Sequence, residues 1–341
     1  MTIKDIARES GYAVGTVSRV INHNPNVSDA ARARILEVIE KYHFQPNANA
    51  KHLKQQANQG IAMIVKGTHN MLFASVLEKM QMECSAAGYT SMVFYIDEND
   101  NEVEQARCVC RERKPTGVIF LGSDRNHFGP DLADLGVPCL LMTNSAASTT
   151  IPNLSSVSVD DVDAAACMVR YLLEKGHRRI GFIGGNLLSS QPSSARLSGC
   201  INEFSRHGLT LDPEKQYVAA RFTLQGGYIA IKQLLETMPD LTAVFAFSDI
   251  MAIGAMRALR DQRLYVPVNV SVCGFDGIEL TDYLARRLTT IRQPVDQMAA
   301  RGVSILIRCI EEGCDAVHEL VPYELLTRES VRRLPDTNKT H

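Results

Sequence analysis

From Gly60 onward, short apolar runs alternate with segments of helical periodicity, and this alternation limits the possible folds more than any other feature. A buried parallel strand reads as a continuous apolar run, and a helix crosses over to the next strand. The clearest runs are "IAMIV", "SMVFYI", "GVIFL", "CLLM", "RIGFIGG", "AVFAFS" and "VSVCGF", with helices near 73–87, 162–174, 229–236 and 250–260 between them. Because one six-stranded sheet cannot hold so many strands, we predict an α/β core of two doubly wound lobes. A ligand cleft is expected at the carboxyl ends of the strands.

The N-terminal segment has a different pattern, which predicts an all-α helix-turn-helix head. Its central stretch, "GYAVGTVSRVIN", predicts a short helix from about Val14 to Ile21 after a turn at Gly11. Ser28 is suited to capping a third helix. Gly15 lies in the first turn of the short helix, where glycine costs about 1 kcal/mol relative to alanine. The alternatives are a weak spot in a surface helix and a place that something must approach closely.

Charge is unevenly distributed along the chain. Residues 1–56 carry eight Lys and Arg against five Asp and Glu, a net charge of +3, whereas the whole chain carries −2. The remainder therefore carries −5. A basic head on an acidic body is compatible with binding a polyanion such as DNA.

Several function classes lack their expected sequence features. The first apolar run is only five residues long, no run approaches the roughly 18–20 residues that span a bilayer, and the N-terminus has no signal core. A cytoplasmic protein without membrane contact is therefore expected, which argues against a secreted solute-binding protein. No nucleotide-binding, hydrolase or metalloprotease motif is present, which argues against an enzyme. The nine cysteines are scattered, so we expect reduced thiols, no metal site and no cofactor.

The head and body together resemble the lactose-repressor/galactose-repressor (LacI/GalR) transcription regulators. The head matches in "TVSRVIN", "VS…R.RI" and "PN..A..L", and the body in "KGHRRIGFIGG", "SSARLSGC", "FAFSDIMAIGAMRAL", "VSVCGFDGIEL" and "LTTIRQP". This resemblance implies a homodimeric repressor of a palindromic operator on double-stranded DNA. It also implies a core similar to periplasmic sugar-binding proteins, controlled by a small-molecule effector.

The resemblance also implies domain boundaries. The DNA-binding head spans residues 1–45, a hinge helix and linker 46–58, and the effector and dimerisation core 59–330. The first lobe takes residues 59–157 and 292–317, the second 158–291 and 318–330, and a polar tail 331–341. The tail is short and contains Pro335, unlike the leucine-heptad helix of tetrameric members, so a dimer is expected.

DNA contacts are expected from two segments. In a helix-turn-helix, the N-terminal residues of the second helix meet base edges in the major groove. Base contacts are assigned to Val14, Gly15 and Arg19, backbone contacts to Thr16 and Ser18, and a further contact to Asn22. Relatives often carry Ser or Thr where this chain has Ala13, which gives no N-cap. In the hinge, Leu53 resembles a minor-groove wedge, followed by Lys54, with Asn47 and Ala50 in packing positions. Without the head, this segment would read as a plain solvated linker.

Effector contacts are implied at eight positions. Arg196 and Asp276 are expected on opposite sides of the cleft, a pairing that suits a polyhydroxylated ligand. Phe222 resembles a sugar-stacking platform, and Gln293 lies at a crossover. The remaining positions are Leu72 and Phe73 in a first-lobe loop, Thr143 and Ser248. The alternatives are a surface ion pair for Arg196, a helix N-cap for Asp276 and core packing for Phe222.

Two departures from the family pattern affect the identity of the effector. Thr143 and Ser248 stand where sugar-binding relatives often carry Asp and Asn. The effector is therefore expected to be a larger ligand, a disaccharide or a phosphosugar, or a molecule that is not a sugar. The sequence leaves open whether it acts as inducer or corepressor. His177 in "GHRR" is interpreted as structural.

Overall fold

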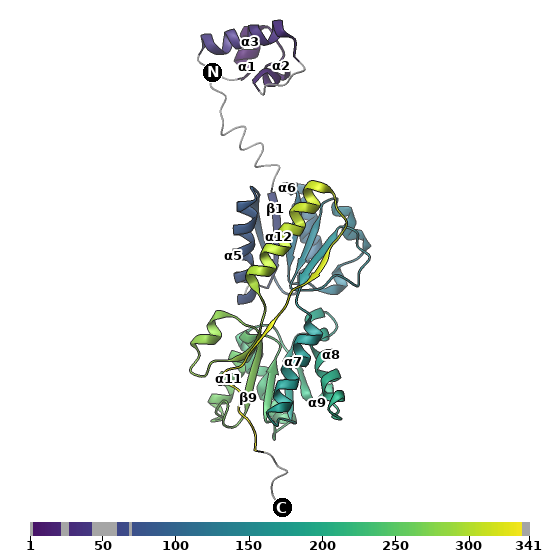
Figure 1. Ribbon diagram of the computed structural model, residues 1–341, viewed down its shortest axis with the longest axis vertical. Helices are drawn as coiled ribbons and strands as arrows, with labels where there is room; N and C mark the ends of the chain where they lie inside the picture. Colours follow the sequence, from purple (N-terminus) through teal and green to yellow (C-terminus); the bar gives the residue numbers. More distant parts are fainter. Residues whose placement is uncertain (1–2, 22–26, 43–59, 68–69, 336–341) are drawn as a thin grey trace, which may run out of the picture. The chain divides into compact units, whose positions relative to one another are not determined.

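The computed structural model describes residues 3–21, 27–42, 60–67 and 70–335, and the chain divides into two compact units, Met1–Ala57 and Asn58–His341 (Figure 1). Each unit has a hydrophobic core of its own. No helix of the described segments is long and apolar enough to cross a membrane.

The first unit contains three short helices, α1 (Ile3–Ser10), α2 (Val14–Ile21) and α3 (Asp29–Lys41). A turn at Gly11, with φ of 78°, separates the first two. Ser28 caps α3 by accepting from the Ala31 amide at 3.4 Å, as expected. The buried core residues from all three helices are Ile6, Ala7, Val17, Val20, Ile35 and Val38. The expected helix-turn-helix and the bounds of its second helix are confirmed.

The first lobe of the second unit is built on a six-stranded parallel sheet of order β11-β5-β4-β3-β1-β2. Odd and even residues of β1 enter different apolar clusters, so helices must cover both faces. The helices α5 and α12 lie side by side on one face, and α6 lies on the other (Figure 1). The strands are β1 (Gly60–Lys66), β2 (Thr90–Ile96), β3 (Gly117–Leu121), β4 (Cys139–Met142), β5 (Leu154–Ser158) and β11 (His318–Leu320); the helices are α5 (Met71–Ala86), α6 (Glu102–Arg113), α12 (Val295–Glu312) and the 3-10 turns η1 (Arg125–His127) and η2 (Pro130–Leu135).

The second lobe repeats this plan with the order β12-β10-β9-β8-β6-β7, in which β12 is antiparallel to β10. The helices α10 and α11 share one apolar cluster with this sheet, while α7 and α8 pack in another. The strands are β6 (Ile180–Gly184), β7 (Tyr217–Ala219), β8 (Ala243–Ala246), β9 (Ser271–Asp276), β10 (Thr289–Arg292) and β12 (Glu324–Leu326); the helices are α7 (Asp161–Glu174), α8 (Gln191–Arg206), α9 (Pro213–Gln216), α10 (Leu224–Thr237), α11 (Asp249–Asp261) and the 3-10 turn η3 (Glu279–Tyr283).

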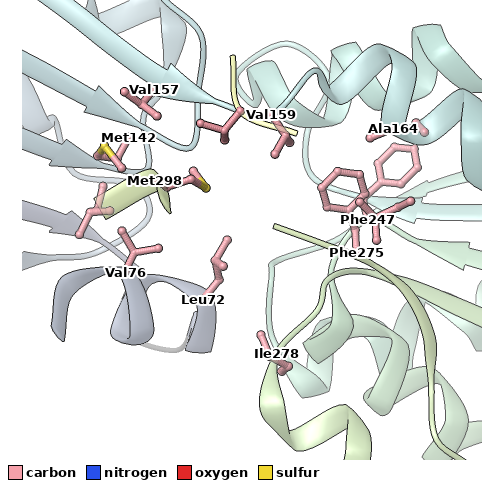
Figure 2. Close-up of a cluster of buried hydrophobic side chains, with 14 of the residues drawn as sticks. Leu72, Val76, Met142, Val157, Val159, Ala164, Phe247, Phe275, Ile278 and Met298 are labelled. Carbon is pink, nitrogen blue, oxygen red and sulfur yellow. The ribbon is translucent and has the colours of Figure 1, made fainter. Parts of the chain in front are cut away.

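Three crossovers connect the lobes, following β5, β10 and β11. The third comes later than residue 317, where we expected it. The strand β11 pairs in parallel with β5, His318 opposite Ser156, so residues 318–320 belong to the first lobe. Figure 2 shows buried side chains of both lobes near these connections, including Met142 and Met298 in the first lobe and Phe247 and Phe275 in the second.

The first part of the C-terminal tail packs on the second lobe rather than extending as a polar tail. Val331 is buried, and the Leu334 amide donates to the Lys175 carbonyl at 2.8 Å. The buried His177 ring contacts the Arg332 carbonyl through Nε2 at 3.0 Å and the Thr242 hydroxyl through Nδ1 at 3.1 Å. Its structural role is therefore as expected, with the tail as one partner.

Candidate functional site

The helix α2 presents a divided surface. Val17 and Val20 are buried in the core of the first unit, whereas Val14, Gly15 and Arg19 are exposed. A Cβ on Gly15 would meet no atom within 4 Å, so packing among the described residues does not require glycine there. The open space is compatible with both expectations, a weak spot in a surface helix and a place that another molecule approaches closely.

The first turn of α2 has no side-chain N-cap from residue 13, as expected for alanine. The amides of Thr16 and Val17 donate to the Ala13 carbonyl at 2.9 and 3.1 Å, but alanine has no side-chain oxygen to accept from the first turn. Thr16 and Ser18 are half-buried beside the exposed face. The other expected DNA-contacting residues lie outside the described part of the chain: Asn22, Asn47, Ala50, Leu53 and Lys54.

The second unit contains a cavity of about 480 Å³ between its two lobes, within the size range of small-molecule sites. Two of its wall residues, Thr143 and Asp276, have positive φ values of 70° and 119°. Such backbone strain in non-glycine residues clusters at binding sites. Seven of the eight expected effector residues line this cavity: Leu72, Phe73, Thr143, Arg196, Phe222, Asp276 and Gln293.

Ser248 is the exception, because it does not line the cavity. Its hydroxyl accepts from the Met251 amide at 3.3 Å and caps α11, and the residue is buried. Leu72 and Phe73 also differ from expectation. They lie in the first turn of α5, which Asn70 caps, rather than in a loop. The helix start therefore holds both side chains in place against the cavity.

Arg196 is held rigidly in the cavity wall. Its Nε donates to Asp161 Oδ1 at 2.8 Å, its Nη1 donates to the Phe247 carbonyl, and the guanidinium carbon lies 3.5 Å from the centroid of the Phe275 ring. The side chains of Arg196 and Asp161 are only 5% and 10% exposed, so the alternative of a surface ion pair is wrong. Arg196 belongs to α8 and Asp276 to β9, so both come from the second lobe and not from opposite sides of the cleft.

Asp276 is a buried acceptor at the end of β9, bonded to Gln293 of the β10–α12 crossover. Its Oδ1 accepts from Gln293 Nε2 at 2.9 Å, and its carbonyl accepts from the Gln293 amide at 3.0 Å. Burial raises the pKa of Asp276 to about 7, although Arg196 and the Gln293 hydrogen bond act in the opposite direction. The following 3-10 turn begins after Ile278 and has no side-chain cap, so Asp276 is not an N-cap.

Gln293 adds an acceptor with no partner. Its Oε1 atom is buried and has no hydrogen-bond partner among the described residues. A buried unpaired acceptor costs stability, so a ligand donor at this position would recover it. Phe222 packs against the second-lobe core, as one interpretation expected, and also lines the cavity; its role as a stacking platform stays a prediction.

Sequence reasoning missed the charged residues of the first-lobe wall. Lys66 ends β1 and donates to Glu102 Oε2 at 2.6 Å, with both side chains buried. Glu102 also accepts from the Asp124 amide at 2.6 Å and contacts His127 Nδ1 at 2.9 Å. A lysine directly after a buried apolar run was the available signal, because lysine is rarely buried without a partner.

Contacts across the cleft were also missed. Arg221 of the second lobe pairs with Glu98 of the first through Nε at 2.6 Å, and with Asp97 at 3.3 Å. Two hydrogen bonds also connect the lobes, from Gln191 to the Ser145 carbonyl at 2.7 Å and from Asn126 to the Leu188 carbonyl at 3.2 Å. These contacts hold the lobes together around the cavity. In the described segments, no cluster of three or more metal-ligating side chains is present.

Comparison with known proteins identifies similar chains over the full length. Residues 2–47 match the model of bacterial regulatory proteins of the lacI family, and residues 169–331 match a periplasmic binding protein-like domain. The transcriptional regulator MalR of Clostridium butyricum is 33% identical over 97% of this chain and 99% of its own length. The transcriptional repressor CytR of Escherichia coli K12 is 30% identical over 98% and 97%.

Solved structures agree on the fold. The transcriptional regulator CelR in complex with cellobiose is 26% identical, with a TM-score of 0.73 over 97% of this chain and 99% of that one. The lac repressor dimer bound to operator and the anti-inducer ONPF is 22% identical, with a TM-score of 0.74 over 97% and 99%. The second likeness supports the fold alone.

Proposed function

This chain belongs to the lacI family of bacterial regulatory proteins, and from that premise we propose that it represses transcription as an operator-binding homodimer controlled by a sugar-like effector. The observation that carries the proposal is the similarity over nearly the whole chain to transcriptional regulators. A regulator of this kind acts in the cytoplasm, where bacterial DNA lies, and its cavity binds rather than transforms the ligand.

We propose that the exposed face of α2 reads the operator. Arg19 donates a pair of hydrogen bonds to a guanine, Val14 contacts a thymine methyl, and Gly15 permits close approach of the backbone. Thr16 and Ser18 contact phosphates and fix the register. The proposal is supported by the two faces of α2, because Val17 and Val20 pack into the core on one face while Val14, Gly15 and Arg19 are exposed on the other. The same proposal assigns DNA contacts to Asn22 and to the hinge residues Asn47, Ala50, Leu53 and Lys54.

The cavity favours an uncharged hydroxylated effector. Of the residues that the structure describes, three cations line the cavity, and each already has a carboxylate partner: Lys66 with Glu102, Arg196 with Asp161, and Arg221 with Glu98. A phosphate would have to displace one of these carboxylates. By contrast, Asp276 and Gln293 Oε1 are acceptors suited to ligand hydroxyl groups. An unphosphorylated sugar therefore fits better than a phosphosugar.

Control follows from the position of the cavity between the lobes. A ligand that contacts both lobes binds one lobe arrangement more tightly than another and shifts the equilibrium toward it. We propose that this shift decides whether the paired heads and hinges of the dimer hold the operator.

The test is fluorescence anisotropy of the full-length protein on a palindromic duplex obtained by selection. Arg19→Ala should weaken binding by about 1–3 kcal/mol, roughly 5- to 150-fold in Kd, because a bidentate guanine contact is lost. The matched control is Arg34→Ala, since Arg34 is half-exposed and pairs with Glu37 on α3. Neutral disaccharides, but not their phosphorylated forms, should change operator affinity. Equal losses for the two arginine variants would contradict the assignment of α2.

A further inference from the structure

The C-terminal end of α12 brings two thiols together outside the effector cavity. Cys309 lies in the last turn of the helix and Cys314 directly follows Gly313, which ends it. Their Sγ atoms are 2.7 Å apart. A disulfide bond is about 2.05 Å long, so bond formation needs a movement of less than one ångström.

The helix cap explains why these residues meet. Gly313 adopts the left-handed conformation with φ of 66°, and its amide donates to the Cys309 carbonyl at 3.2 Å. In this type of cap, the residue after the left-handed glycine contacts the residue four positions before that glycine, usually through apolar side chains. In "CIEEGC" both positions are cysteine, so an ordinary capping contact becomes a dithiol.

The pair faces a small cavity of about 280 Å³ on the first lobe, separate from the effector cavity. Cys314 is half-buried, whereas Cys309 is only 6% exposed and burial raises its pKa to about 11. Asn153 lines the same cavity, and its Oδ1 atom is buried with no hydrogen-bond partner in the described segments. A small polar molecule that donates a hydrogen bond suits this space.

We propose that Cys309 and Cys314 form an oxidisable dithiol site, which a small peroxide converts to an intramolecular disulfide and a thiol reductant restores. The more accessible Cys314 attacks hydrogen peroxide as the thiolate, breaks the O–O bond and becomes a sulfenic acid, releasing hydroxide. The Cys309 sulfur then attacks the Cys314 sulfur, and the S–O bond breaks. The Cys309 proton and the departing hydroxide form one water molecule, and the hydroxide released in the first step takes up the proton that Cys314 lost to form the second. Two thiols are oxidised, and one peroxide is reduced to two water molecules.

The position of the pair gives the bond a structural consequence. Residues 313–317 lead from α12 into β11, from which the chain makes its third crossover to the second lobe. Ser155 of β5 lies beside this segment, since its Oγ accepts from the Val317 amide at 3.0 Å and is 4.0 Å from Cys309 Sγ. A disulfide would therefore tie the end of α12 to the segment that enters the crossover.

The chain offers a matched control pair. Cys108 and Cys110 lie two residues apart on α6, where neighbouring side chains at that spacing do not face each other. Cys108 is exposed and Cys110 half-buried, so this pair is at least as accessible as Cys309 and Cys314. Accessibility alone would therefore favour oxidation of the control pair.

The experiment treats the reduced full-length protein with hydrogen peroxide, quenches it with catalase, alkylates free thiols and maps peptides by mass spectrometry. The expected result is a cross-linked peptide joining Cys309 and Cys314, lost after dithiothreitol and absent in Cys314→Ser. The double variant Cys108→Ser, Cys110→Ser should cross-link like the parent protein. A thermal melt checks that Cys314→Ser is folded, and Cys309→Ala provides a second variant. Failure to recover the cross-link, or oxidation of both thiols to sulfinic acids instead, overturns the proposal.

Discussion

Replacing Asp276 with asparagine should stabilise the ligand-free protein, and more strongly at pH 8 than at pH 5. Burial raises the pKa of this carboxyl from 3.8 to about 7. The proton is therefore held more tightly in the folded than in the unfolded protein. The contribution of Asp276 to the free energy of unfolding falls as the pH rises from 3.8, the pKa of the carboxyl in the unfolded chain, to about 7, its pKa in the folded protein. The loss is complete above about pH 7.

The magnitude follows from the pKa difference. Each unit corresponds to about 1.36 kcal/mol, so Asp276 costs about 4 kcal/mol of folding free energy at pH 8, where it is ionised, and between about 1 and 2 kcal/mol at pH 5, where it takes up a proton on folding. Asparagine has no charge and can keep the hydrogen bond from Gln293, whose donor lies 2.9 Å from the carboxylate. Effects of asparagine that do not depend on pH cancel between the two conditions. The gain should therefore be about 2–3 kcal/mol larger at pH 8.

Differential scanning calorimetry of the full-length protein measures this difference. A gain of 2–3 kcal/mol corresponds to roughly 5–10 °C in Tm for a domain of this size. The control is Asp240→Asn, which makes the same substitution at a carboxylate that pairs with Arg179 on an exposed surface. An equal Tm shift for Asp276→Asn at both pH values would refute the reasoning. If Asp276 binds the effector as proposed, the same variant should also bind it more weakly, because asparagine replaces one carboxylate oxygen acceptor with an NH2 donor.

Two further predictions concern the head and the cleft. Ser28→Ala removes the side-chain acceptor for the Ala31 amide and should destabilise the first unit by about 1 kcal/mol. Thermal unfolding followed by circular dichroism should show the helical signal of the first unit lost at a lower temperature. An unchanged unfolding temperature of this unit would contradict the stabilising role of the cap. Arg221→Gln breaks the ion pairs with Glu98 and Asp97, which are exposed and worth at most about 1 kcal/mol, so the Tm should change little. Amide hydrogen exchange near residues 97–99 should nevertheless become faster, because the lobes separate more often; unchanged exchange would show that the pairs do not restrain the lobes.

The elements that the sequence predicted well are those with a strong local signal. The bounds of α2 follow from the glycine turn and the spacing of Val17 and Val20, and the long buried strands follow from continuous apolar runs. The strand β5 was missed because "LSSVS" contains three serines. Two of these hydroxyls contact residues far along the chain: Ser156 Oγ lies 2.9 Å from His318 Nδ1, and Ser155 Oγ accepts from the Val317 amide at 3.0 Å. Such partners become visible only when the chain has folded.

The candidate site was likewise predicted only where the signal lay in the local sequence. The resemblance placed Arg196 and Asp276 at the cavity, but it could not show that Asp161 holds the arginine or that both residues belong to one lobe. The pair of Lys66 and Glu102 joins residues 36 positions apart, which no local pattern predicts. Ser248 was assigned to the ligand because of its position in a family motif, whereas its hydroxyl is used by the first turn of α11.

The polar centre of the cavity lies at one of the three crossovers that connect the lobes. Gln293 stands between β10 of the second lobe and α12 of the first, and its amide and side chain both donate to Asp276. A ligand that donates to Gln293 Oε1 and Asp276 therefore adds contacts at the crossover itself, where a small rotation moves a whole lobe. Arg221 lies elsewhere on the cavity wall. Its ion pairs are weak, because the side chains of Arg221 and Asp97 are each more than half exposed. The ligand contacts at the buried hinge, rather than these exposed pairs, should then supply most of the free-energy difference between lobe arrangements.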